Sequence, residues 1–127
     1  MKIINAKDIT GTEHDVNWGN GTSRRMIVES DGMGYSVHYT VMYRGTSSRL
    51  EYKNHLESCY VLSGTGTIEA DGKVHKLQPG DMYVLDQHDR HLVSADTEQD
   101  MVILSIFNPA CKGTETHNLK DGEASGY

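Results

Sequence analysis

The side chains best able to bind a metal or transfer a proton lie between residues 45 and 91 of the sequence. They include Glu57, Tyr83, His88 and His91. A carboxylate, a phenolate and a neutral imidazole together offset a divalent cation, and a bound metal can lower the pKa of a tyrosine from its usual value of about 10. Glu57, Tyr83 and His91 therefore form a candidate metal triad. His88 is the alternative to His91, and a metal-free site with Tyr83 as a core hydroxyl is the simpler alternative.

Glycines frame these residues at regular spacing. Gly45, Glu57 and Gly64 follow the pattern G-x11-E-x6-G. A second block, G-x7-G-x2-Y-x3-Q, is made by Gly72, Gly80, Tyr83 and Gln87. Both spacings resemble the two cupin motifs, but Glu51, Lys53 and Tyr83 stand where those motifs have histidine. The resemblance implies an all-β fold, a cupin jelly-roll barrel, with Glu57 and Tyr83 at ligand positions on neighbouring strands.

Length and composition limit the class of protein. The 127 residues suffice for a single domain with one core, and 13 glycines against 2 prolines suit a turn-rich all-β chain. The net charge of −6 argues against nucleic acid and anionic membranes as partners. No stretch approaches the roughly 20 apolar residues of a membrane span. The chain shows no signal-peptide pattern and its two cysteines form no metal or redox spacing, so we expect a cytoplasmic protein.

Short strands and turn signals run along the chain. Residues 34–43 alternate with a period of two, and we expect their polar face, which carries His38 and Thr40, to point into a barrel with a ligand cavity. In an ordinary sandwich that face would point to water. The chain up to residue 24 predicts one short strand and a polar stretch. Further strands are expected at 26–29, 50–62, 82–85, 92–95 and 101–107, with turns at 63–66, 71–72 and 79–81. This even spacing indicates a barrel or a double-sheet jelly roll.

Three other features have both a structural and a functional interpretation. Trp18, the only tryptophan, either plugs a barrel end or forms a wall of a ligand pocket. Arg24 and Arg25 are either solvated, or one of them binds a substrate carboxylate through both guanidinium nitrogens. The polar tail at 108–127 contains the sequence GTETH at 113–117 and is either a disordered terminus or a lid over the cavity.

Four stretches make the resemblance more specific, and it then covers nearly the whole chain. They are DGMGYSVHYT (31–40), YKNHLE (52–57), GDMYVLDQHDRH (80–91) and GTETH (113–117). They resemble the ectoine synthase family, in which tyrosine also replaces histidine in the second cupin motif. The resemblance implies a homodimeric enzyme that closes N4-acetyl-L-2,4-diaminobutyrate into ectoine, a compatible solute, with loss of water.

The same resemblance implies roles for individual residues. Glu57, Tyr83 and His91 would hold Fe(II), with Zn(II) as the alternative, and the metal would act as a Lewis acid. The residues implied in catalysis are Tyr52, His55 and Glu115. The residues implied in substrate binding are Trp18, Arg25, Thr40, Leu85, Asp89 and Phe107.

Two other functions fit the same barrel. An Fe(II)-dependent cupin dioxygenase would use oxygen, and the absence of histidine at positions 51 and 53 counts against it. A non-catalytic cupin that binds a small molecule needs no metal, and the charged, histidine-rich cavity counts against it. Metal analysis separates the binding protein from the two enzymes, and oxygen consumption separates the enzymes from each other.

Overall fold

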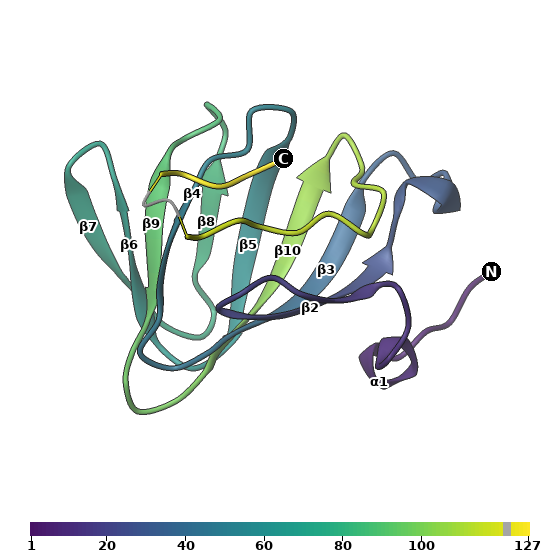
Figure 1. Ribbon diagram of the computed structural model, residues 1–127, viewed down its shortest axis with the longest axis horizontal. Helices are drawn as coiled ribbons and strands as arrows, with labels where there is room; N and C mark the ends of the chain where they lie inside the picture. The colour runs from purple at the N-terminus through teal and green to yellow at the C-terminus, as the bar shows by residue number, and fades with distance from the viewer. Residues whose placement is uncertain (121–122) are drawn as a thin grey trace.

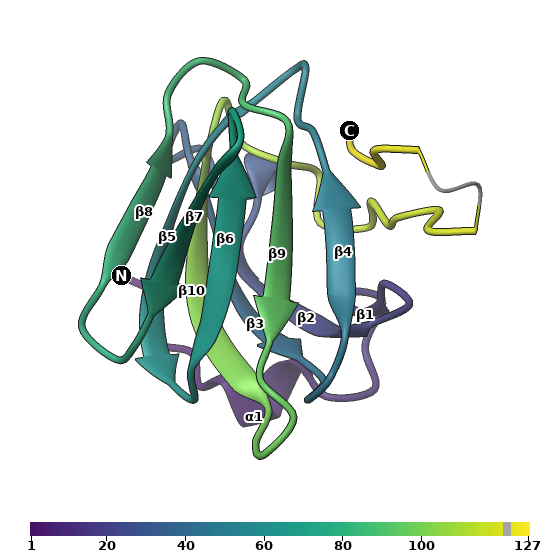
Figure 2. The same cartoon turned by 90° about the vertical axis from the view of Figure 1, so that its left-hand side faces the viewer.

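The computed structural model describes residues 1–120 and 123–127. They form a six-stranded and a four-stranded antiparallel sheet that face each other (Figures 1 and 2). The strand order of the larger sheet is β1 (Asp15–Asn17), β2 (Gly21–Ile27), β3 (Ser36–Met42), β10 (Met101–Asn108), β5 (Leu56–Ser63) and β8 (Met82–Leu85). That of the smaller sheet is β4 (Ser47–Leu50), β9 (His91–Ala95), β6 (Gly66–Ala70) and β7 (Lys73–Leu77). The predicted all-β jelly-roll barrel is confirmed.

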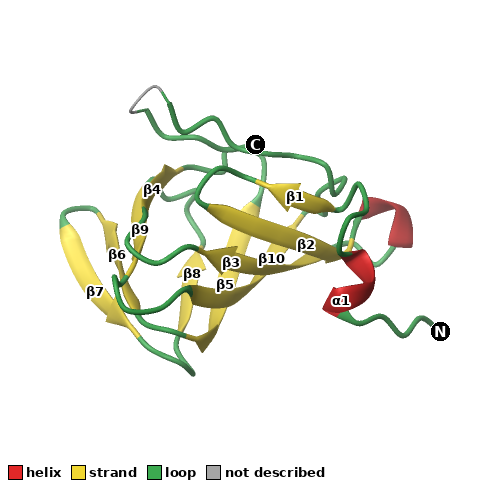
Figure 3. Ribbon diagram, turned by 60° about the horizontal axis from the view of Figure 1, so that its bottom comes forward, coloured by secondary structure: helices red, strands yellow, loops and turns green. Residues whose placement is uncertain are grey.

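Helical structure is confined to short turns outside the sheets (Figure 3). The helix α1 (Ala6–Ile9) starts at Asn5, whose side chain accepts a hydrogen bond from the Lys7 N–H while Asp8 accepts one from the Asn5 N–H. This reciprocal cap satisfies two amides that would otherwise lack a partner. A 3-10 turn covers Glu29–Asp31. No helix among the described residues is long and apolar enough to cross a membrane.

The alternation predicted for residues 34–43 is present in β3, with its polar face inward as expected. Ser36, His38 and Thr40 are buried, whereas Val37 and Tyr39 on the opposite face are partly exposed. Successive side chains of a strand point to opposite sides of the sheet. The barrel interior therefore carries polar side chains along one of its central strands.

The apolar core comes from both sheets. Val61 on β5 and Met101 and Ile103 on β10 are almost fully buried, and Ile68 and Val93 cover them from the smaller sheet. The hydrophobic core and the polar cavity share this interior, because strand β10 contributes to both.

The sequence-based prediction was wrong in the first thirty residues. The strand expected at 26–29 is β2, which begins earlier, at Gly21, and ends at Ile27. The chain before residue 24 contains α1 and the short strand β1. The polar residues Ser23 and Arg25 obscured the pattern, because they occupy the inward positions that apolar residues normally take.

The predicted turns are confirmed, and two of them require glycine for different reasons. Asp71 and Gly72 both have positive φ, 51° and 73°, as a two-residue hairpin between β6 and β7 requires. Gly64 also has positive φ, 76°, but a Cβ there would in addition collide with the backbone of Asp100 and Met101. Gly64 is thus fixed by both conformation and close packing.

We predict that Gly64→Ala destabilises the barrel more than Gly72→Ala does. Both substitutions place a Cβ in the left-handed region, which costs about 1–2 kcal/mol. Only Gly64→Ala adds a backbone collision, for which overpacking costs about 1–3 kcal/mol more. Denaturant unfolding of the two variants measures the difference, and equal losses of stability would contradict the collision.

Candidate functional site

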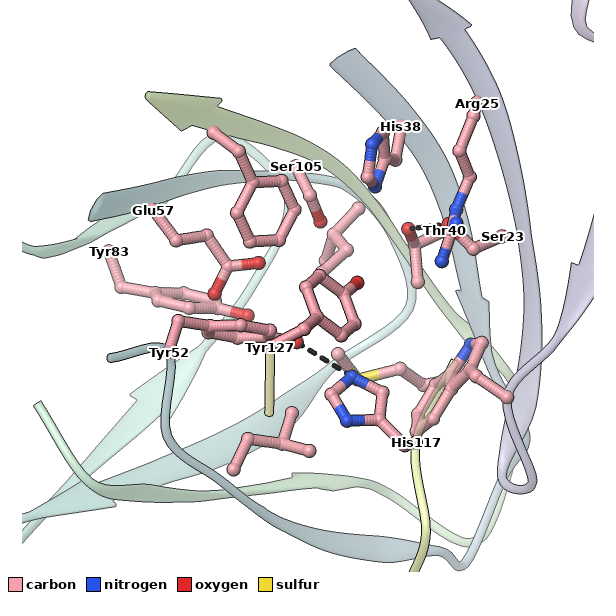
Figure 4. A pocket seen from close by; sticks show the side chains of 15 residues that line it. Ser23, Arg25, His38, Thr40, Tyr52, Glu57, Tyr83, Ser105, His117 and Tyr127 are labelled. Carbon is pink, nitrogen blue, oxygen red and sulfur yellow. Dashed lines mark hydrogen bonds between the residues drawn. The ribbon is translucent and has the colours of Figure 1, made fainter. Parts of the chain in front are cut away.

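A cavity of about 30 Å³ lies between the two sheets and has room for about one water molecule. Its polar lining comes mainly from inward positions of the larger sheet (Figure 4). Seven residues predicted for the site line it: Trp18, Arg25, Thr40, Tyr52, Glu57, Tyr83 and Phe107. Trp18 is thus both deeply buried and a wall of the cavity, so its two interpretations are compatible.

Three predicted residues lie in an adjoining hollow instead. His55, Leu85 and Asp89 line this second space, which shares Tyr52 and Glu57 with the cavity. His55 was expected to continue the strand that carries Glu57, but β5 begins only at Leu56. Its Nδ1 donates a hydrogen bond to the carbonyl of Pro109, 2.7 Å away.

Glu57 and Tyr83 are brought together by the pairing of β5 with β8, which sets Cys59 opposite Tyr83 and Glu57 opposite Leu85. Both side chains are buried, and Figure 4 shows the Glu57 carboxyl pointing toward the Tyr83 hydroxyl. Burial raises the pKa of Glu57 to about 8 and raises that of Tyr83 well above its usual range. Two oxygen groups therefore converge in a place where an ionised form needs a nearby cation.

His91 lies on β9, across the barrel interior, and its ring centroid is 6.3 Å from that of Tyr52. It does not line the cavity in this structure. Its Nδ1 donates to the Asp89 carbonyl at 2.9 Å, and its buried Nε2 has no hydrogen-bond partner among the described residues. Burial lowers the pKa of His91, so the ring is neutral with its lone pair on Nε2.

His88, the alternative to His91, borders the adjoining hollow and not the cavity. It is exposed, has a positive φ of 53°, and its Nδ1 donates to the Tyr52 carbonyl at 2.8 Å. Metal-binding histidines usually donate their other ring N–H to a carbonyl, as both histidines do here. Burial and the unpartnered Nε2 distinguish His91.

The residues present fit a metal ion. In the part of the chain that the structure describes, no three His, Cys, Asp or Glu side chains gather as a metal-binding group. The predicted triad differs from such a group because one of its three members, Tyr83, is a tyrosine. A raised carboxyl pKa at Glu57 and an unpartnered imidazole nitrogen at His91 are each what binding to a cation would resolve.

Arg25 supplies a buried cation, whereas Arg24 is only partly buried and lies 3.9 Å from Asp15. The Arg25 side chain is almost fully buried, its Nε donates to Ser23 Oγ at 2.9 Å, and its Nη2 donates to the Glu115 carbonyl at 2.7 Å. Its buried Nη1 has no hydrogen-bond partner among the described residues. The guanidinium can therefore accept a carboxylate at the cavity.

Glu115 does not line the cavity. Its carboxylate accepts the N–H groups of Lys112 and Gly113 at 2.7 and 2.8 Å, and lies 3.9 Å from Arg25 Nη1. Burial raises the pKa of Glu115, but these N–H donors and Arg25 together lower it by more. The net shift of the pKa is therefore downward. Glu115 thus shapes the tail and holds Arg25 in place.

The described parts of the tail lie alongside β1 and β4 (Figure 2) and contact both strands. Thr116 donates to the Asn17 carbonyl, and Ser125 exchanges backbone hydrogen bonds with Arg49 and Glu51 at 2.9 and 3.0 Å. These contacts place the His117 and Tyr127 side chains in the cavity wall.

Five polar residues of the cavity wall were not predicted as site residues from the sequence: Ser23, His38, Ser105, His117 and Tyr127. His117 belongs to the GTETH cluster, and its Nε2 lies 2.8 Å from the Tyr52 hydroxyl. His38 lies on the predicted inward face of β3, so its position was available from the alternation. Nothing local in the sequence indicates that Tyr127 reaches Tyr52, whose ring centroid is 5.0 Å away.

The sequence matches the family described as ectoine synthase over residues 1–125. An L-ectoine synthase of Halalkalibacterium halodurans is 45% identical over 120 residues, which cover 93% of this chain and 92% of that protein. The chain belongs to the ectoine synthase family. The crystal structure of ectoine synthase from P. lautus matches with a TM-score of 0.85 at 34% identity, covering 98% of this chain and 88% of that one.

The fold is also that of more distant cupins. A Cupin 2 conserved barrel domain protein from Salinispora arenicola matches with a TM-score of 0.66 at 18% identity, covering 84% of this chain and 87% of that one. The predicted cupin fold and the predicted ectoine synthase function are both confirmed. As a member of the ectoine synthase family, the chain is a lyase that acts on a small molecule.

We predict that acid releases the tail before the barrel unfolds. Burial, reinforced by Arg25 and His91, lowers the pKa of His117 to about 4. An undocked tail has the ordinary histidine pKa of about 6.5 and so binds a proton between these two values that the docked tail does not. Docking is therefore strongest above about pH 6.5 and weakens as the pH falls toward 4.

Fluorescence of Trp18 measures this release, because its ring centroid is 5.8 Å from that of His117. The emission should shift to longer wavelength between pH 6.5 and 4. His117→Gln should lose this pH dependence, and the exposed His75→Gln should keep it. A wild-type emission that stays constant down to pH 4 would contradict the prediction.

Proposed function

We propose that the protein closes N4-acetyl-L-2,4-diaminobutyrate into ectoine within the cavity between the sheets. The observation that carries this proposal is the charge pattern of the cavity, where Arg25 lies on one side and Glu57 with Tyr83 on the other (Figure 4). The substrate has a carboxylate at one end and an amide carbonyl at the other. Membership of the ectoine synthase family supports the same reaction.

The substrate carboxylate would bind Arg25. Its buried Nη1 has no hydrogen-bond partner among the described residues, so a carboxylate there supplies the missing acceptor. Ser23 and the Glu115 carbonyl hold the guanidinium from its other side. The carboxylate end of the substrate is thereby fixed relative to β2.

We propose Fe(II) as the metal, with Zn(II) as the alternative, held by Glu57, Tyr83 and His91. When bound, it would polarise the amide carbonyl of the substrate as a Lewis acid. The support is the buried Glu57 and Tyr83 pair together with the free lone pair of His91. Leu85 and Asp89 would act behind these ligands, since Leu85 pairs with Glu57 and the Asp89 carbonyl orients His91.

The remaining predicted residues would shape the cavity and exclude water from it. Trp18, Tyr52 and Phe107 form aromatic walls that hold a flexible substrate in a bent conformation, and such orientation can contribute several kcal/mol. Burial raises the pKa of Tyr52, so its hydroxyl stays protonated as a hydrogen-bond donor. Thr40 adds a second hydroxyl. His55 and Glu115 lie outside the cavity wall, and we propose that they position its neighbours.

The tail would serve as a lid that must open before the substrate enters. A cavity of about 30 Å³ holds about one water molecule, far less than a molecule of this size needs. The Tyr127 ring occupies part of the space, and its centroid is 5.0 Å from the ring centroids of both Tyr52 and His117. Closure after binding then excludes water from the reaction.

We predict that the iron-loaded protein forms ectoine from the acetylated diamino acid equally well with and without oxygen. The reaction joins an amine to a carbonyl and releases water, so no electrons are transferred. Product formation followed by NMR under strictly anaerobic conditions, beside an aerobic control, checks this outcome. A requirement for oxygen would move the protein to the dioxygenase function, and failure to convert the substrate under either condition would contradict the proposal.

Variants of the ligands complete this experiment. Tyr83→Phe should lose iron and conversion together, because it removes one of the two oxygen ligands. His88→Ala is the matched control, since His88 is exposed and its Nδ1 donates to a backbone carbonyl. Iron content by elemental analysis, read beside the circular dichroism spectrum of the same sample, separates a lost metal from a damaged fold. Full iron retention by Tyr83→Phe would remove the phenolate from the ligand set.

We also propose that the protein is a homodimer. The outer face of β5 and β8 carries five exposed apolar side chains: Leu56, Tyr60, Leu62, Met82 and Val84. Exposed apolar patches of this kind usually mark an interface, and β8 is also an open sheet edge. A second copy of the chain would cover both.

We predict that Val84→Glu separates the dimer, because it buries a charge in the proposed interface. Val74→Glu, at an exposed valine of β7 on the other sheet, should not. Light scattering should give twice the chain mass of 14.1 kDa for the wild type and for Val74→Glu. A wild-type protein that is monomeric at micromolar concentration would contradict the proposal.

A further inference from the structure

His38 is a titratable residue of the cavity to which the proposed function gives no role. It lies on β3, where its neighbours across the sheet are Arg25 on β2 and Ser105 on β10. Its side chain is 1% exposed and points into the cavity (Figure 4). The ring packs against Phe107, with the two centroids 4.9 Å apart. Burial and the contact with Phe107 thus restrict the position of the imidazole.

The Nε2 atom of His38 is uncommitted. It is buried and has no hydrogen-bond partner in the described part of the chain. The other imidazole of the cavity wall, His117, bonds to Tyr52 and Ser125 through its two nitrogens. His55 lies outside the cavity and is tied to the Pro109 carbonyl.

The carboxyl groups near the cavity are also committed. Glu57 belongs to the proposed metal site, and the Glu115 carboxylate already accepts two backbone N–H groups. A neutral histidine with a free lone pair is therefore the best proton acceptor that the cavity offers.

The surroundings keep His38 neutral at working pH. Burial lowers its pKa well below 6.5, and three groups act in the same direction: Arg25 on β2, His55 before β5 and His14 before β1. Each of these is cationic when charged, and none of them stabilises a charged His38. A substrate ammonium that donates to Nε2 would fix the neutral ring in the tautomer with its hydrogen on Nδ1.

We infer that His38 is the general base of the cyclisation, which takes a proton from the 2-ammonium group of the substrate and returns it to the departing oxygen. This inference rests on the proposed function. The 2-amino nitrogen and the carboxylate are attached to the same carbon of the substrate. Arg25 and His38 lie opposite each other on paired strands and both line the cavity, so a carboxylate bound to Arg25 places that nitrogen in the space that His38 borders.

The proton and bond changes balance. His38 Nε2 takes one proton from the ammonium, and the freed amine forms a bond to the amide carbon as the C=O π electrons move to oxygen. A second proton of the same nitrogen passes to that oxygen to give a hydroxyl. The proton on Nε2 then joins the hydroxyl as the C–O bond breaks, and water leaves. The product amidinium keeps the positive charge that the ammonium carried.

The test is steady-state kinetics of His38→Gln in the iron-loaded protein. We expect kcat to fall roughly 10²- to 10⁴-fold, the usual contribution of a positioned base. KM should change by no more than about twofold, because Arg25 still binds the carboxylate. The residual rate should rise about tenfold per pH unit, since hydroxide must then deprotonate the ammonium. Iron content should equal that of the wild type.

Two controls separate a catalytic role from a structural one. His75→Gln changes an exposed histidine of β7 and should leave kcat unchanged. His38→Ala should regain part of its kcat with added imidazole, which a packing defect alone would not show. If wild-type protein is active and His38→Gln keeps its kcat, the role of His38 is wrong while the proposed function stands. If wild-type protein does not form ectoine, both are wrong.

Discussion

The desolvation of polar side chains inside the barrel is the constraint on which the rest of the structure depends. A sheet face that carries Ser23, Arg25, His38 and Thr40 inward must satisfy these groups without bulk water. Some find protein partners, as the Ser23 and Thr40 hydroxyls do with each other at 3.1 Å. Others, such as Arg25 Nη1 and His91 Nε2, find none within residues 1–120 and 123–127, and each costs about 1–3 kcal/mol in the folded state. A bound substrate or metal would relieve this cost, so the barrel holds its polar groups ready for ligands at the expense of stability.

The same desolvation sets the protonation states of the cavity. Burial lowers the pKa of His38, His91 and His117, which favours the neutral imidazole. Burial raises the pKa of Glu57, which favours the neutral carboxyl group. Arg25 keeps its charge because a guanidinium does not lose its proton in proteins. The side chains of the cavity wall thus include one cation among neutral groups. This arrangement favours an anionic group at Arg25 and a metal beside Glu57.

Local patterns in the sequence predicted the fold and much of the site, and longer-range features escaped them. The alternation in β3 and the glycine spacing predicted a barrel with Glu57 and Tyr83 together, because period and turn residues act within a few positions. The start of β5 at Leu56 placed His55 outside the cavity wall, and this depended on tertiary contacts that the spacing does not encode. Tyr127 reaches the cavity only because Ser125 bonds to residues more than seventy positions earlier in the chain.

The burial of Arg25 has a consequence for behaviour at high ionic strength. Charges on the surface are screened over about 3 Å in 1 M salt, compared with about 10 Å at 0.1 M, whereas buried charges are screened far less. The surface of this chain is acidic, and its contributions to attraction and repulsion fade as salt rises. Arg25 is 2% exposed, so its electrostatic interactions inside the barrel are screened little by salt. Recognition of a carboxylate in this barrel therefore depends on a charge that concentrated electrolyte does not reach.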